Sequence, residues 1–161
     1  CSSLKSVNIP DSVTEIGEAA FRNCTSLTSI TIPDSVTSIG WSVFYDCTGE
    51  LITNSKIIEI DYNVGDKYSS NYPTYGGWLN GAKFAKLILG DNIKRIGEGV
   101  FCKFTSLESI TIPDSVTSIG EYAFRNCDAL NSFYGKYASD DNRCLICADE
   151  LIAFASAIVY I

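Results

Sequence analysis

The sequence contains no histidine. This absence removes Ser-His-Asp and Cys-His catalysis, zinc sites built on imidazole, and the usual general base near neutral pH. The sequence also has no apolar run long enough to span a bilayer, and no segment with the layout of a signal peptide. We therefore expect no membrane insertion, and an enzyme would have to use carboxylates or tyrosines.

Positive charge is also scarce. Twelve basic residues stand against nineteen acidic ones, which gives a net charge of −7. Binding to nucleic acid depends on a basic surface that releases counterions from phosphates, and an anionic lipid surface makes a similar demand. We expect neither nucleic acid nor an anionic membrane as a partner.

What the sequence does have is a repeat. The segment TSLTSITIPDSVTSIG at 25–40 returns at 105–120 with a single change, from Thr28 to Glu108. The period is 23 residues, which indicates a solenoid over the whole chain, 1–161. Because Cys1 already falls inside a repeat, we expect the sequence to be a piece of a longer chain. The predicted units are 1–23, 24–46, an irregular unit 47–80 with an insert, 81–103, 104–126, 127–155 ending in a hairpin, and 156–161 as the start of a truncated unit.

Each unit has the same internal plan. It opens with L-x-x-V-x-I, as at Leu4, Val7 and Ile9, which is typical of a strand with alternate residues inward. A proline such as Pro10 ends the strand, because proline has no N–H for the ladder. V-x-x-I-G then predicts a second short extended segment. An aromatic residue and usually a cysteine, three apart, predict a single helical or 3₁₀ turn. We expect the four repeated phenylalanines to be buried and stacked in one column: Phe21, Phe44, Phe101 and Phe124.

These motifs resemble the BspA-like leucine-rich repeat family of bacterial surface and secreted proteins, whose repeat reads roughly L-x-x-I-x-I-P-x-x-V-x-x-I-G-x-x-A-F-x-x-C. The resemblance implies an α/β-type solenoid, coiled right-handedly, with parallel strands on one face and short second strands and single helical turns elsewhere. It further implies a non-catalytic adhesion or interaction module, without a cofactor or metal, at the cell surface or outside the cell.

The sequence leaves the binding residues open. If the strand face binds a protein or a glycan, such as host extracellular matrix, the outward residues of each strand make the contact. They are Ser6, Asn8, Ser29, Thr31, Lys86, Ile88, Ser109, Thr111, Ser132 and Tyr134. Tyr72, Tyr75 and Trp78 of the insert would flank them as aromatic anchors. The alternatives are that these rings only fill the core, and that the chain is a spacer presenting other domains.

Two units depart from the pattern. In the third unit, which carries 11 extra residues, the strand after Cys47 cannot be placed in register. The sixth unit has Gly135 where an aliphatic residue belongs. Beyond it, Arg143–Cys147 and Leu151–Ala155 predict the arms of a β-hairpin.

The seven cysteines are predicted to be structural. Four occupy one repeat position and should form a buried column of free thiols, with Phe104 filling the gap. Disulfides between neighbouring units are the alternative. Cys144 and Cys147 fall within one predicted strand, where residues three apart face opposite sides, so we expect neither a redox pair nor a zinc site. The column consists of Cys1, Cys24, Cys47 and Cys127.

Overall fold

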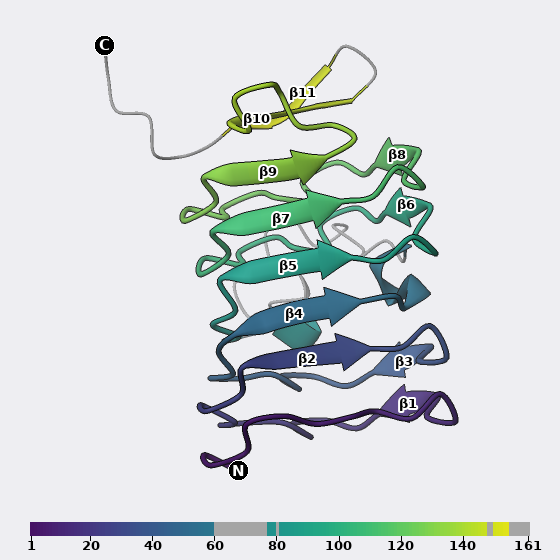
Figure 1. Cartoon of the computed structure of the whole chain (residues 1–161), viewed down its shortest axis with the longest axis vertical. Helices are drawn as coiled ribbons and strands as arrows, with labels where there is room; N and C mark the ends of the chain where they lie inside the picture. The colour runs from purple at the N-terminus through teal and green to yellow at the C-terminus, as the bar shows by residue number, and fades with distance from the viewer. Residues whose placement is uncertain (60–76, 80, 148–149, 155–161) are drawn as a thin grey trace, which may run out of the picture.

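The computed structural model describes residues 1–59, 77–79, 81–147 and 150–154, and the chain winds into a stack of coils (Figure 1). Each coil after the first contributes one strand to a parallel sheet, in the order β2-β4-β5-β7-β9. The predicted solenoid is confirmed. The strands are β2 Ser29–Ile32, β4 Glu50–Thr53, β5 Lys86–Leu89, β7 Ser109–Ile112 and β9 Ser132–Gly135. The first coil joins the sheet through a single bridge from Ser6 to Ser29.

The inward residues of these strands form an unbroken apolar row. Ile30 pairs with Leu51, Leu51 with Leu87, Leu87 with Ile110, and Ile110 with Phe133. All five side chains are at most 1% exposed. Burying such a row against the rest of each coil is the main stabilising term of a solenoid.

The third coil corrects the prediction that its strand has no register. β4 pairs in register with both β2 and β5. The turn between Cys47 and Glu50 is two residues shorter than its counterpart between Cys24 and Ser29. Gly49 makes this possible, because its φ is +94° and a Cβ there would lie 2.4 Å from the Thr28 carbonyl oxygen.

The second extended segments form a smaller, interrupted layer. β1 Glu15–Ile16 pairs in parallel with β3 Ser38–Ile39, and β6 Arg95–Ile96 with β8 Ser118–Ile119. In the third coil the 3₁₀ helix η1, Lys56–Glu59, takes this place. The Ile58 carbonyl accepts a hydrogen bond from Gly97 N at 2.7 Å, as the Ile16 carbonyl does from Gly40 N at 2.8 Å. The predicted fold class holds, and its helical part is small: within the described residues the only helices are η1 and the 3₁₀ helix η2, Gly77–Leu79.

The predicted turn at the aromatic corner is confirmed in each regular coil. Cys24 N donates to the Phe21 carbonyl at 3.2 Å, and Cys47 N donates to that of Phe44 at 2.9 Å. In each of these turns, the residue directly before the N–H donor adopts the left-handed backbone conformation, which Asn and Asp tolerate better than most residues do. The four residues are Asn23, Asp46, Lys103 and Asn126, with φ between 59° and 63°.

The phenylalanine column is divided in two, against the prediction. Phe44 stacks on Phe21 with centroids 5.7 Å apart, and Phe101 stacks on Phe124 at 5.5 Å. Trp78 meets Phe44 edge-on at 6.0 Å, in the coil between the two pairs. Phe44, Phe101 and Phe124 are buried, but Phe21 is only half-buried because no coil covers it.

The two ends of the stack differ. At the C-terminal end a β-hairpin, β10 Cys144–Cys147 and β11 Glu150–Phe154, lies beyond β9 (Figure 1), which confirms the predicted hairpin. Its Leu145 is fully buried, and Phe133 N donates to the Asn142 carbonyl at 2.8 Å. At the N-terminal end, Ile16 is buried, but most apolar residues of the first coil are only partly buried: Leu4, Val7, Ile9, Val13 and Phe21.

Candidate interaction surface

The outward residues of the strands form two columns, which together we call the strand face. The first column continues from strand to strand in the pairing register, and so does the second. The first consists of Ser6, Ser29, Glu50, Lys86, Ser109 and Ser132, and the second of Asn8, Thr31, Ile52, Ile88, Thr111 and Tyr134. Parallel strands lie about 4.8 Å apart, so the paired residues of five strands extend over roughly 19 Å.

Sequence reasoning missed Glu50 and Ile52, the two members supplied by the third coil. A strict 23-residue period does not place them, because the strand of the third coil begins two residues early. The alternation of Glu50, Leu51, Ile52 and Thr53 was the signal that could have found them. Without these two residues the strand face would have a gap at its middle.

The middle of the strand face combines an ion pair with two aliphatic side chains. Lys86 Nζ lies 2.6 Å from Glu50 Oε1, with the two side chains 49% and 29% exposed. Next to this ion pair, Ile52 and Ile88 are paired in register, lie side by side on the sheet and are half-buried. The two charges neutralise each other locally, so the centre offers apolar contact more than net charge.

On either side of the aliphatic pair, the second column of the strand face carries hydroxyl-bearing side chains. Thr31 on one side of the aliphatic pair is exposed, and Thr111 on the other is half-buried. Tyr134 at the C-terminal end is 43% exposed, one of three large apolar or aromatic side chains that stand out on the described surface. Tyrosine combines a large contact area with a hydroxyl, which suits a binding surface.

The insert does not supply the expected tryptophan. Trp78 is 2% exposed and packs against Phe44, so it belongs to the core and not to the surface. The indole of Trp78 packs in the core of the long third unit. This agrees with the alternative that the aromatic rings of the insert fill the core. Tyr72 and Tyr75 lie outside the described residues.

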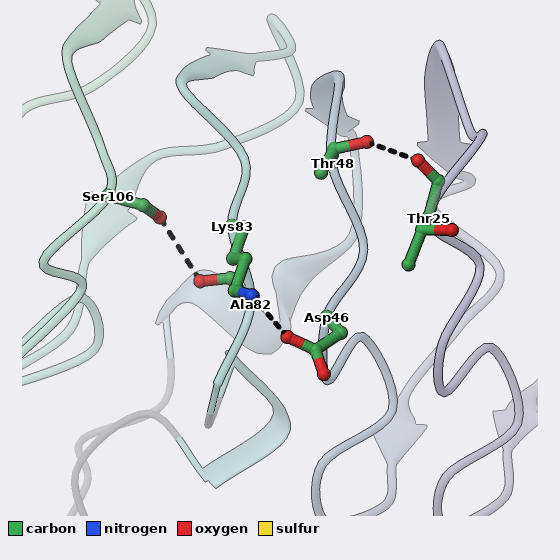
Figure 2. Close-up of polar contacts among 6 residues, drawn as sticks. All are labelled: Thr25, Asp46, Thr48, Ala82, Lys83 and Ser106. Atoms are coloured by element: carbon green, nitrogen blue, oxygen red, sulfur yellow. Dashed lines mark hydrogen bonds and ion pairs between the residues drawn. The ribbon is translucent and has the colours of Figure 1, made fainter.

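Elsewhere, hydroxyl groups link one coil to the next. Figure 2 shows Thr48 Oγ1 donating to the Thr25 carbonyl at 3.0 Å, and Ser106 Oγ donating to that of Ala82 at 3.1 Å. The Lys83–Asp46 ion pair, at 2.6 Å, lies between them. The hydroxyl groups of Thr48 and Ser106 satisfy backbone carbonyls of the preceding coil. We therefore attribute the recurring Ser and Thr residues at these turns to the stacking of the coils.

The cysteine column serves packing too. Cys24, Cys47 and Cys127 are buried, whereas Cys1 is exposed in the first coil, which corrects its expected burial. Cys47 Sγ donates to the Phe21 carbonyl at 2.9 Å, and Cys127 Sγ to that of Phe101 at 3.1 Å. Burial raises the pKa of Cys47 to about 11 and that of Cys127 to about 12. A thiol that stays protonated near neutral pH is neither a good nucleophile nor a metal ligand.

Two further observations bear on function. In the described ranges, no group of three or more His, Cys, Asp or Glu side chains is placed to hold a metal ion. Over the same residues, no helix has the length and apolar character needed to cross a membrane.

The chain is similar to known repeat proteins. Residues 1–70 and 78–141 match, in six copies, the family described as BspA type Leucine rich repeat region. No curated protein matches.

Solved structures of bacterial repeat proteins are also similar. A leucine-rich cell surface protein from Faecalibacterium prausnitzii is 32% identical over 83% of this chain and 32% of its own, with a TM-score of 0.49. A leucine-rich repeat protein from Bacteroides ovatus is 29% identical over 81% of this chain and 37% of its own, with a TM-score of 0.46. For one from Treponema pallidum the identity is 24%, the shares are 75% and 51%, and the TM-score is 0.42. The chain thus spans between a third and a half of these structures.

Proposed function

Because the chain belongs to the BspA-type leucine-rich repeat family, we propose that it is a non-catalytic interaction module that binds its partner through the strand face. We place it in an adhesive protein at the bacterial surface or outside the cell. The partner is a protein or a glycan, with host extracellular matrix as the first candidate.

One observation carries the proposal. The outward residues of five consecutive strands stand in register without a gap, from Ser29 to Ser132 and from Thr31 to Tyr134. Such a sheet offers a broad surface of fixed geometry, whose side chains lose little conformational entropy when a partner covers them. Tyr134, 43% exposed, is a ready aromatic contact at its edge.

The test is a binding screen of the chain against extracellular-matrix proteins and a glycan panel. Thr31→Arg with Thr111→Arg places two bulky cations on the strand face, and Tyr134→Ala removes its exposed ring. We expect both variants to lose at least tenfold in affinity. The matched control is Ser38→Arg with Ser118→Arg, which adds the same charges at exposed positions of β3 and β8 and should bind like wild type.

The competing function is a structural spacer, favoured by the small hydroxyl side chains Ser29, Ser109 and Ser132 of the first column and by the self-paired Glu50 and Lys86. A spacer needs only a solvated surface. No binding to any candidate would favour the spacer, whereas binding that survives the strand-face substitutions would show that the partner contacts another surface.

A further inference from the structure

The centre of the strand face carries two aliphatic side chains that the repeat does not require. Ile52 and Ile88 are half-buried on the outward side of the sheet, whereas Leu51 and Leu87 beside them in the chain are fully buried on the core side. The second and fifth coils carry threonine at the same strand position and form the same strands. A hydroxyl-bearing side chain therefore satisfies the fold there, and the aliphatic pair is available for contact with a partner.

The strand face is electrically neutral, although the chain has a net charge of −7. Its charged residues are Glu50 and Lys86, which pair with each other at 2.6 Å. A charged partner gains little there, whereas an apolar side chain placed on Ile52 and Ile88 removes aliphatic area from water. A glycan would leave hydroxyl groups without hydrogen-bond partners on this aliphatic pair. An apolar centre within a polar border is instead typical of surfaces that bind proteins.

The size of the strand face limits the kind of protein partner. The paired strands extend over about 19 Å and are each about 13 Å long, so the face measures roughly 250 Å². A stable interface between two folded proteins needs about 800 Å² from each partner, so a folded partner would also have to cover the loops at both edges. An extended segment of about six residues, at about 3.3 Å per residue, matches the length of the face by itself.

We infer that the strand face binds an extended peptide segment of low net charge, which lies across the strands with an apolar side chain on Ile52 and Ile88. This inference rests on the proposed function and narrows its partner. Tyr134 provides the second contact, because it lies in the same column two strands beyond Ile88. It is about 12 Å from the midpoint of the aliphatic pair, a distance that an extended chain covers in about four residues. The segment therefore carries a second apolar residue four positions from the first.

The test selects a phage-displayed library of random peptides on the immobilised chain, with peptides of about twelve residues, twice the length of the face. We expect the enriched peptides to share two apolar residues four positions apart and to carry little net charge. For a synthetic peptide of the shared sequence, Ile52→Thr with Ile88→Thr should raise the Kd at least tenfold. This variant should keep the wild-type fold, because other coils carry threonine at the same position. The matched control, Ser38→Thr with Ser118→Thr, introduces threonine at exposed positions away from the strand face and should leave the Kd unchanged.

Two further measurements locate the peptide on the strand face. Tyr134→Ala and an alanine at the second apolar position of the peptide should be non-additive in a double-mutant cycle, because both remove the same contact. A tenfold increase in NaCl concentration should change the Kd by less than about twofold, because the contact does not depend on net charge.

Three results would overturn the inference. The first is a set of peptides rich in Lys or Arg whose binding is lost at high salt. The second is binding that survives Ile52→Thr with Ile88→Thr, and the third is a library that yields no binder. The proposed function still stands after any of them if a matrix protein or a glycan binds the chain and loses affinity with Thr31→Arg and Thr111→Arg. If that screen finds no binder either, the proposed function fails as well.

Discussion

Lys86 Nζ lies 2.6 Å from Glu50 Oε1, on the neighbouring strand, although the insert separates the two residues in the sequence. The extra residues of the third unit therefore leave β4 and β5 paired in register, and the strand face continues across them. The pair forms because β4 and β5 align Glu50 with Lys86. Both side chains remain partly in water, which limits their attraction.

The first prediction concerns this ion pair. We expect Glu50→Gln and Lys86→Gln each to change the free energy of unfolding by less than about 1 kcal/mol, because exposed pairs are screened by water and salt. A double-mutant cycle in urea unfolding measures the coupling, which should shrink further in 1 M NaCl. Coupling well above that value, unaffected by salt, would show that the pair is a structural tie.

The second prediction concerns the divided aromatic column. Phe44→Ala should cost about 3–5 kcal/mol of stability, because the ring is fully buried between Phe21, Phe84 and Trp78. Phe21→Ala should cost clearly less, because Phe21 is half-buried in the open first coil. Urea unfolding of both variants gives the comparison. Equal costs would mean that Phe21 is as well covered in solution as Phe44.

The third prediction concerns Gly135, where the sixth coil departs from the repeat. Its φ is +96°, and a Cβ there would lie 1.9 Å from the Ile112 carbonyl oxygen. Gly135→Ala should therefore destabilise the chain by at least about 1–3 kcal/mol. Gly17→Ala is the control, because a Cβ at Gly17 meets nothing within 4 Å. If thermal unfolding shows the two variants to be alike, the close approach of Gly135 to β7 is absent in solution.

The fourth prediction concerns pH. The pKa values of Cys47 and Cys127 in the folded chain, about 11 and 12, lie above the value of about 8.5 for an unfolded thiol. Between pH 9 and 11 the unfolded chain therefore loses thiol protons that the folded chain keeps, so stability falls as the pH rises. Cys47→Ser with Cys127→Ser should flatten this fall, measured by urea unfolding at each pH. Cys1→Ser, at an exposed position, should leave the slope unchanged, and an equal slope in all three proteins would refute the assignment.

Thiol counting tests the related prediction that the cysteines are free. Under denaturing, non-reducing conditions we expect about seven reactive thiols per chain, one for each cysteine in the sequence. In the native state Cys1 should react first, because it is exposed while Cys24, Cys47, Cys102 and Cys127 are buried. A denatured count of five or fewer would reveal disulfides.

The sequence by itself determined the solenoid, since a 23-residue period with apolar residues at fixed positions can bury its core in only one way. Leu27, Ile30 and Ile32 recur as Leu107, Ile110 and Ile112, and both sets are buried. The turns and the hairpin followed from local chemistry, because proline and alternating apolar residues act over a few residues. The outward members of the regular strands could be named for the same reason.

Only the tertiary structure decided what happens where the period breaks. Leu51 enters the core row because pairing with β2 and β5 outweighs the spacing along the chain, and this brings Glu50 and Ile52 to the strand face. Trp78 is buried because the coils around it leave room for an indole beside Phe44. Phe21 and Cys1 are exposed or half-exposed because burial in a solenoid comes from the neighbouring coil, and a residue's own repeat position cannot supply it.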